Sequence, residues 1–167
     1  MDIATRRMTA DDLNALKGID AAPTLNSTAD RTADRIEGLA SFLGQKAGAG
    51  LVAYALATDA MPELLLGYII GFSVNQDAEI IDLVVRSDYR RQGIGRQLIK
   101  GFCDAFGDHV TYLEVARKNR PAYQLYLNMG FVEYGNRKAY YQTANGRDDA
   151  ILMRKYGSIS PDIKLKS

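Results

Sequence analysis

Arg90-Arg91-Gln92-Gly93-Ile94-Gly95-Arg96 is the stretch of sequence that decides the fold. It follows an apolar run at residues 80–85 and precedes residues 98–106, where apolar side chains recur at helical spacing. This order predicts a buried strand, a turn through two glycines and a helix start. Glycine lets a backbone approach a ligand closely, and the first turn of a helix offers unpaired N–H groups to an anion. Three arginines add positive charge, so the stretch predicts a turn that binds a pyrophosphate. The alternative is a solvated basic turn whose glycines allow tight packing.

Two phosphate-binding motifs do not fit this turn. The dinucleotide fingerprint requires a third glycine three positions after the second, where this chain has Leu98. The P-loop requires Gly-Lys-Ser/Thr at the end of its turn, and that sequence does not follow here. The remaining pattern, Arg-x-x-Gly-x-Gly, does not identify which ligand carries the pyrophosphate.

Hydrophobic periodicity and turn residues predict an α/β fold, a mixed sheet with helices packed on its faces. We expect strands at residues 1–9, 51–58, 64–74, 79–85, 110–116, 131–134 and 150–156. We expect helices after a cap at Asp11 or Asp12, at residues 33–43, within 90–107 and at 121–129. We expect turns or irregular connections at residues 44–50, at 75–77 and, around Asn145-Gly146, in a long segment between the last two strands. One domain is expected over residues 1–156, with a flexible tail at 157–167.

Composition excludes several broad classes of function. The chain has 21 Lys and Arg against 20 Asp and Glu, and the net charge of +1 gives no support to nucleic-acid or membrane-surface binding. No window is apolar enough for a membrane span, and no apolar segment follows Arg6 and Arg7 as in a signal peptide. The single cysteine, Cys103, excludes an internal disulfide and fits a cytoplasmic location. One cysteine and one histidine, His109, suggest no metal site.

Three residues after the glycine turn carry candidate chemistry. Glu114 lies in an apolar strand, where a carboxylate is costly unless it is paired or used, so it is a candidate general base. The alternative for Glu114 is a position facing solvent at a sheet edge. Asn119 precedes the helix that begins at Pro121, and it either caps that helix or donates its amide to a ligand. Tyr126, between two leucines on the same helix, is either core or a proton donor.

Several segments together resemble the GNAT superfamily of N-acetyltransferases. Residues 85–96 resemble its acetyl-CoA signature, and residues 113–115, Asn119 and residues 123–131 resemble its second motif block. Arg137-Lys138-Ala139-Tyr140-Tyr141 and the Asn-Gly-Arg-Asp-Asp-Ala sequence at 145–150 are similar to the RimI-type enzymes, which acetylate the N-terminal alanine of a ribosomal protein. The resemblance covers residues 79–153 in order. It implies the GNAT fold, a mostly antiparallel central sheet with splayed central strands and flanking helices.

The resemblance also implies a role for each matching residue. Glu114 would be the general base, directly or through water, and Tyr126 the acid that protonates the leaving thiolate. Tyr140 and Tyr141 would line the groove for the substrate N-terminus. The co-substrate acetyl-CoA would be held by the end of a strand, the glycine turn and one side-chain amide. The residues concerned are Leu83, Val84 and Val85 in the strand, Arg90, Arg91, Gln92, Gly93, Ile94, Gly95 and Arg96 in the turn, and Asn119.

The acceptor is less closely defined than the chemistry. The resemblance implies a protein N-terminus, with a ribosomal protein that begins with alanine as the expected partner. We expect a monomer or weak dimer. RimI-type chains usually carry an aromatic-Pro-Trp-Ser motif, but this chain has no Trp and has Ala-Ala-Pro-Thr-Leu at residues 21–25. Lys118 stands where the family usually has Ser. A peptide α-amine has a pKa of about 7.7–8.0 against about 10.4 for lysine, so a single carboxylate base favours the α-amine.

Two alternatives stay open. One is a GNAT enzyme that acts on a small-molecule amine or a lysine side chain, which the missing Trp motif keeps in contention. The other is a catalytically silent acyl-CoA-binding or interaction module. Glu114 and Tyr126 together argue against that module, because binding alone requires neither. A covalent acyl-enzyme would need a reactive thiol, whereas Cys103 lies in the apolar stripe of a helix and is expected in the core.

Overall fold

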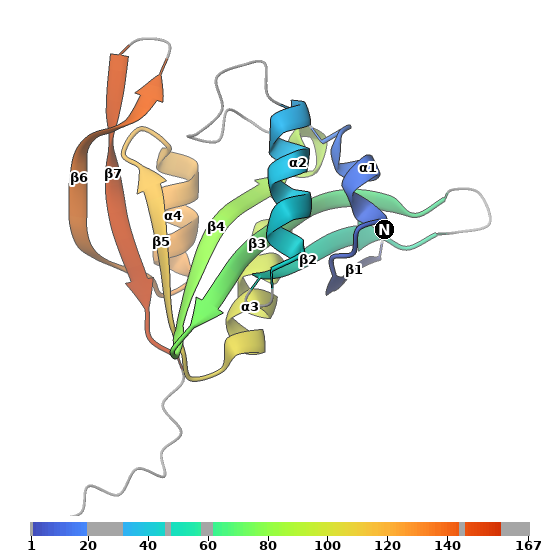
Figure 1. Ribbon diagram of the computed structural model, residues 1–167, viewed down its shortest axis with the longest axis horizontal. Helices are drawn as coiled ribbons and strands as arrows, with labels where there is room; N and C mark the ends of the chain where they lie inside the picture. The colour runs from blue at the N-terminus through green and yellow to red at the C-terminus, as the bar shows by residue number, and fades with distance from the viewer. Residues whose placement is uncertain (1, 20–31, 46–47, 58–61, 144–145, 158–167) are drawn as a thin grey trace, which may run out of the picture.

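The computed structural model describes residues 2–19, 32–45, 48–57, 62–143 and 146–157, which form a seven-stranded sheet with helices on both faces (Figure 1). The strands are β1 (Ile3–Arg7), β2 (Gly48–Ala55), β3 (Leu64–Val74), β4 (Asp77–Val85), β5 (Val110–Ala116), β6 (Val132–Thr143) and β7 (Gly146–Lys155). The helices are α1 (Asp12–Leu16), α2 (Thr32–Leu43), α3 (Ile94–Phe106) and α4 (Arg120–Asn128). A short 3₁₀ turn spans Ser87–Tyr89. The predictions made for residues 21–25, Asn145 and the tail from 158 lie outside the described residues.

The strand order is β1-β2-β3-β4-β5-β7-β6. The pair β4–β5 is parallel, and the other neighbouring pairs are antiparallel. This arrangement confirms the predicted mixed, mostly antiparallel sheet. The hairpin between β3 and β4 turns at Asn75 and Gln76, which both have positive φ (52° and 70°), so the turn predicted at 75–77 is confirmed.

The prediction of a flexible turn at residues 44–50 is wrong at its end, because β2 already begins at Gly48. Gly48 pairs with Phe72 on β3. Gly50 is packed so closely that a Cβ there would lie 3.1 Å from Met8 Cβ and 3.2 Å from Leu43 Cδ2. Ladder pairing and close packing thus override the weak strand propensity of glycine.

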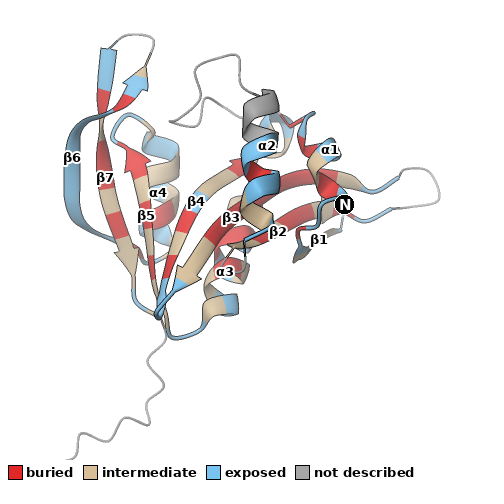
Figure 2. Ribbon diagram, in the orientation of Figure 1, coloured by how far each residue is buried: buried red, intermediate tan, exposed pale blue. Residues whose placement is uncertain are grey.

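The buried apolar residues of the strands, drawn red in Figure 2, divide between two cores, one on each face of the sheet. The core beneath α1 and α2 includes Leu16, Leu39, Val52, Tyr68, Ile70 and Val84. The core beneath α3 and α4 includes Leu66, Ile80, Leu98, Phe102, Leu113, Val115, Ile151 and Met153. Because Leu113 and Val115 face α3 and α4, Glu114 between them points to the opposite face of the sheet.

The segment between the last two predicted strands departs most from the sequence prediction. Residues expected as an irregular connection form a long hairpin of β6 and β7 instead. The prediction failed because β6 is the edge strand and is exposed over most of its length, so no apolar alternation marks it (Figure 2). On the side where α1 and α2 cover β2 and β3, no helix in the described part of the chain covers β5, β7 and β6 (Figure 1). We call this surface the open face.

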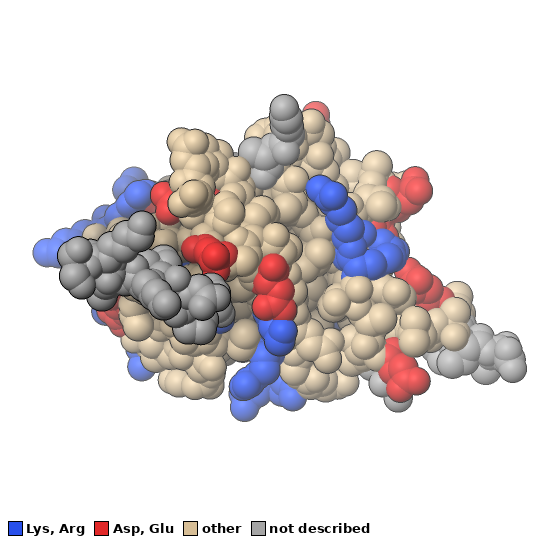
Figure 3. All heavy atoms as spheres, turned by 90° about the horizontal axis from the view of Figure 1, so that it is seen from below, with Lys and Arg blue, Asp and Glu red and all other residues tan. Residues whose placement is uncertain are grey.

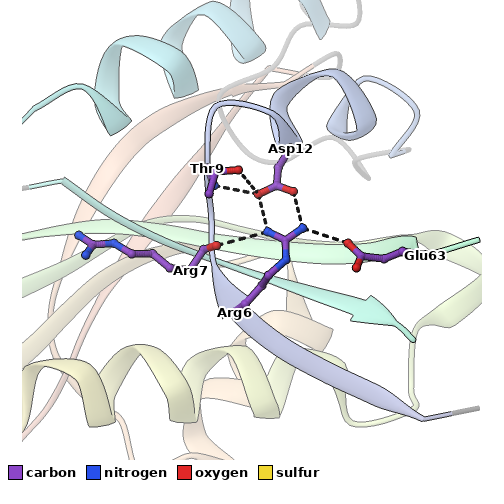
Figure 4. Close-up of polar contacts among 5 residues, drawn as sticks. All are labelled: Arg6, Arg7, Thr9, Asp12 and Glu63. Carbon is purple, nitrogen blue, oxygen red and sulfur yellow. Dashed lines mark hydrogen bonds and ion pairs between the residues drawn. The ribbon is translucent and has the colours of Figure 1, made fainter. Parts of the chain in front are cut away.

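Asp12 makes a contact different from the predicted helix cap. Asp11 holds the N-cap position of α1, as predicted, but its side chain makes no cap bond to any described residue. The buried Asp12 carboxylate instead accepts hydrogen bonds from the Thr9 N–H and from Arg6, which also pairs with Glu63 (Figure 4). Burial raises the pKa of Asp12, but the bonds from Arg6 and Thr9 outweigh it and hold this pKa below its usual value. The cluster ties β1 to the turn before α1.

Basic and acidic side chains are interspersed on the described surface seen from below, which agrees with the net charge of +1 (Figure 3). Within the described ranges, no helix is both long enough and apolar enough to cross a membrane.

Candidate active site

The two central strands separate part-way along their length. In the described structure, β4 and β5 pair only as far as Ile80 and Leu113. From there β4 continues along β3 to Val85, and β5 continues along β7 to Ala116. A β-bulge lies where they part, because the β3–β4 register skips Ile81. The predicted splayed central strands are confirmed.

The predicted pyrophosphate turn lies at the start of α3, after β4 and the 3₁₀ turn. Gly93 is the N-cap of α3 in the left-handed conformation (φ 84°), which glycine adopts without strain. The first intrahelical bond runs from the Gln97 N–H to the Gly93 carbonyl, so the N–H groups before Gln97 point out of the helix end. The exposed side chains around this end are those of Arg90, Arg91, Gln92 and Arg96. The arrangement suits an anion.

Gly95 has a packing role, as expected from the alternative in which the glycines of this turn allow tight packing. A Cβ at Gly95 would lie 3.1 Å from Leu125 Cδ2 on α4 and 3.9 Å from Val85 Cγ2. A Cβ at Gly93 would meet no described atom within 4 Å. Gly93 therefore shapes the turn, and Gly95 brings α3 against α4 and the end of β4.

Other predicted cofactor residues face inward or already have partners. Arg90 Nε donates to the Val85 carbonyl at 3.0 Å. Ile94 is buried in the core beneath α3. Leu83 packs against that same core, and Val84 lies in the core beneath α1 and α2. At Leu83, Val84 and Ile94 the backbone is the part left to meet a ligand.

Glu114 is the first residue of β5 beyond its pairing with β4, and it lies on the open face. Its side chain is 20% exposed, and its Oε1 lies 3.0 Å from Nη1 of Arg137 on β6. The partial burial predicted for Glu114 is confirmed. The alternative of a sheet edge is wrong, because β5 lies between β4 and β7.

Glu79 adds a second carboxylate to the open face. It pairs in register with Tyr112 on β5, next to Glu114. Burial raises the pKa of Glu79, the negative charge of Glu114 raises it further, and the Arg137 guanidinium lowers it. Two carboxylates therefore share the field of one arginine.

Tyr126 approaches the same region from the other side of the sheet. It is 7% exposed on α4, and its ring packs edge-on against Phe131 with centroids 5.7 Å apart. Burial raises the pKa of Tyr126 well above its usual value, and Asp82 and Tyr141 raise it further. Asp82 lies on β4 beyond the pairing of this strand with β5. Tyr126 is thus both core and a phenol that stays protonated.

Asn119 caps α4, since its Oδ1 accepts from the Ala122 N–H at 3.3 Å. The cap uses the oxygen, which leaves the amide NH₂ able to donate to a ligand. Asp148 on β7 fixes the preceding turn, because its buried carboxylate accepts the Lys118 N–H at 2.9 Å.

Tyr140 and Tyr141 lie at a bulge of β6. Ala139 has a φ of 52° there, and its N–H donates to Asp149 Oδ1 at 2.9 Å. Tyr140 is 47% exposed and Tyr141 is 4% exposed, with ring centroids 4.9 Å apart. Burial and then the charge of Glu114 raise the pKa of Tyr141. Of the two predicted substrate residues, only Tyr140 offers an exposed ring.

Cys103 packs half-buried against the core beneath α3, as predicted. Burial raises the pKa of its thiol, which is the opposite of what a nucleophile needs. Among the described residues, His, Cys, Asp and Glu side chains do not gather into a group that could hold a metal ion.

Four polar residues of this region had no role in the sequence prediction, namely Glu79, Arg137, Asp148 and Asp149. Each meets a partner on another strand or turn, so local spacing does not identify it. The only available signal was the position of Arg137, Asp148 and Asp149 inside the segments that resemble the RimI-type enzymes.

Comparison with known proteins shows what this arrangement resembles. Residues 20–131 match the acetyltransferase (GNAT) family. The chain is 37% identical over 94 residues to the ribosomal protein bS18-alanine N-acetyltransferase of Escherichia coli K12, covering 52% of this chain and 64% of that protein. It is 31% identical over 114 residues to the N-alpha-acetyltransferase RimI of Mycobacterium tuberculosis H37Rv, covering 68% of this chain and 65% of that protein. Both alignments span less than two thirds of the relative's own length.

The similarity of folds extends over nearly the whole chain. The crystal structure of the ribosomal-protein-S18-alanine N-acetyltransferase from Escherichia coli superposes with a TM-score of 0.79. The superposition covers 99% of this chain and 100% of that one at 25% sequence identity.

Proposed function

The chain belongs to the acetyltransferase (GNAT) family, and we propose that it transfers the acetyl group of acetyl-CoA to the N-terminal α-amine of a protein. The first candidate acceptor is a ribosomal protein that begins with alanine, because the E. coli relative is named for that reaction. The RimI-type enzyme of M. tuberculosis is likewise named an N-alpha-acetyltransferase.

One observation carries the proposal. Glu114 is the first β5 residue beyond the β4–β5 pairing, and the N-terminus of α3 follows the end of β4 that has left β5. A carboxylate and an anion-binding helix end therefore flank the same separation of strands. Acetyl transfer to an amine from a donor that carries a pyrophosphate would use both, the helix end for the donor and the carboxylate for the proton of the acceptor.

The residues present fit acetyl-CoA, which supplies the activated acetyl thioester when bound. The helix end at Gly93, with Arg91 and Arg96, would hold the pyrophosphate. The backbone of residues 83–85 would pair with the pantetheine arm as an added strand. The Asn119 amide would donate to the same co-substrate.

Glu114 and Tyr126 would handle the two protons of the reaction. Glu114 accepts, directly or through water, the proton that the acceptor nitrogen loses as it bonds to the acetyl carbon. Tyr126 donates its hydroxyl proton to the sulfur that leaves as the carbon–sulfur bond breaks. The raised pKa of Tyr126 keeps the phenol protonated at neutral pH, so it enters each turnover as a donor.

The test is to locate the acetyl group by mass spectrometry. The acceptors are a peptide that begins with alanine and carries one internal lysine, the same peptide with a blocked N-terminus, and spermidine. We expect acetylation at the α-nitrogen of the first peptide and at no other amine. Modification of the lysine or of spermidine in place of the α-amine would overturn the proposed acceptor. Acetyl-CoA binding without turnover on any acceptor would favour the silent binding module.

A further inference from the structure

We propose that Arg137 binds the carbonyl oxygen next to the acceptor amine and thereby selects peptide N-termini over other amines. The inference rests on the proposed N-α-acetyltransferase function and adds a specificity-determining residue to it.

Arg137 is held between the candidate base and the exposed tyrosine. Its Nη1 lies 3.0 Å from Glu114 Oε1, and its Cζ lies 5.2 Å from the centroid of the Tyr140 ring. These contacts occupy one edge and one face of the guanidinium, while the side chain stays 52% exposed. A guanidinium has five N–H donors, so donors remain for a ligand on the open face.

The bulge of β6 fixes this position. Asp149 accepts the Ala139 N–H at 2.9 Å, and its other oxygen lies 3.5 Å from Arg117 Nε. Arg137 stands at the start of the bulge and Tyr140 within it. The backbone that carries the guanidinium is therefore tied to β7 and to the turn after β5, which makes Arg137 a pre-set recognition group.

The spacing of the Glu114–Arg137 pair matches a peptide N-terminus. Standard bond lengths separate the amine nitrogen of a first residue from its carbonyl oxygen by about 3 Å. The carboxylate oxygen and the guanidinium nitrogen are 3.0 Å apart. One residue could thus place its amine on Glu114 and its carbonyl on Arg137 together. A lysine side chain or a polyamine has no carbonyl at this spacing and leaves the guanidinium unmatched.

Arg137 also has a simpler electrostatic effect, which must be separated from recognition. Its positive charge offsets the two carboxylates, Glu79 and Glu114. Loss of that charge would change kcat/KM by the same factor for every amine. Loss of a hydrogen bond to the carbonyl would lower kcat/KM only for acceptors that carry this carbonyl, by roughly tenfold to a hundredfold.

The experiment compares an alanine-start peptide with an analogue whose first peptide bond is replaced by a trans-alkene. The quantity is the ratio of kcat/KM values for the two acceptors, measured in wild type and in Arg137→Gln. The two acceptors differ in amine basicity, but this difference cancels when the ratios of the two enzymes are compared. We expect the ratio to fall tenfold or more in Arg137→Gln and by less in Arg137→Lys, which keeps the charge.

The matched control is Arg154→Gln. Arg154 also stacks on a tyrosine of the sheet, with its Cζ 5.5 Å from the Tyr134 centroid. The substitution Arg154→Gln should leave the ratio of the two kcat/KM values unchanged. If Arg137→Gln lowers kcat/KM equally for both acceptors, the recognition role is wrong while the proposed function stands. If wild type acetylates neither acceptor, the proposed function fails first, and the inference fails with it.

Discussion

Two arginine–carboxylate pairs in this chain are built from the same chemical groups and sit in opposite surroundings. In the first, Asp12 is 6% exposed and accepts two bonds from Arg6, at 2.7 and 2.8 Å, and two from Thr9, one from its N–H and one from its hydroxyl (Figure 4). In the second, Glu114 is 20% exposed and meets Arg137, itself 52% exposed, through a single contact of 3.0 Å. We call the first the closed pair and the second the open pair.

The difference follows from where each pair lies on the sheet. The closed pair joins β1 to α1, in the part of the molecule where two helices cover the strands. The open pair joins β5 to β6 on the open face. A carboxylate has about four acceptor positions. Asp12 fills them within the chain, whereas Glu114 keeps positions for a substrate proton. The closed pair is therefore structural, and the open pair is the candidate for chemistry.

Glu114→Gln breaks the open pair and should have the largest effect. We expect acetyl transfer to an alanine-start peptide at pH 7 to fall by about 10²–10⁴-fold, the range for loss of a general base. The midpoint of thermal unfolding should change little, because the removed ion pair is partly exposed. The control is Asp104→Asn, which alters an exposed carboxylate on α3 and should leave kcat unchanged. A large decrease of Tm in Glu114→Gln would show that Glu114, like the closed pair, has a structural role.

Tyr126→Phe removes the proton donor and keeps the ring. We expect kcat to fall by about 10²-fold, at the lower end for general acid–base catalysis. Stability should be nearly unchanged, since the contact of the ring with Phe131 remains. Steady-state kinetics together with thermal unfolding would check both parts. Unchanged kcat would reduce Tyr126 to a core residue.

Asp12→Asn breaks the closed pair and should act on stability instead of turnover. We expect a loss of about 2 kcal/mol in the free energy of unfolding at pH 7, with kcat preserved. Because the pKa of Asp12 is lowered by folding, its contribution is present above the unfolded pKa of about 3.9 and is lost as pH falls through the folded value. Urea unfolding at neutral and acidic pH should therefore show the difference between wild type and variant shrinking toward low pH. A difference that grows in acid would reverse this assignment.

Lys100→Ala extends the comparison to a fully solvated pair. Lys100 and Asp104 are one turn apart on α3, and their side chains are 70% and 61% exposed. Such pairs contribute about 0.5 kcal/mol or less, so stability and turnover should both stay near wild type in the same assays. A loss of unfolding free energy comparable to that of Asp12→Asn would show that side-chain exposure does not determine how much these pairs stabilise the fold.

The sequence predicted the buried parts of the molecule well because burial leaves a pattern. β3 and β5 have the predicted bounds, 64–74 and 110–116, since apolar runs end there at turn residues. Glu114 drew attention because a carboxylate interrupts an apolar strand, and the role predicted for Tyr126 came from the family resemblance; both roles remain predictions. β6 was missed because an exposed edge strand needs no apolar face. Arg137 and Asp149 were given no role because their partners lie on other strands, and only the β6 bulge brings them together.

The open pair is tested most directly by the pH dependence of kcat/KM for wild type and Glu114→Gln on an alanine-start peptide. If Glu114 takes the proton of the amine, the ratio of wild type to variant should be largest near pH 7. It should then shrink above about pH 8, where the α-amine is already free of its proton. A ratio that stays constant from about pH 6.5 to about 9.5 would contradict the role of Glu114 as base and leave the Glu114–Arg137 pair a structural contact.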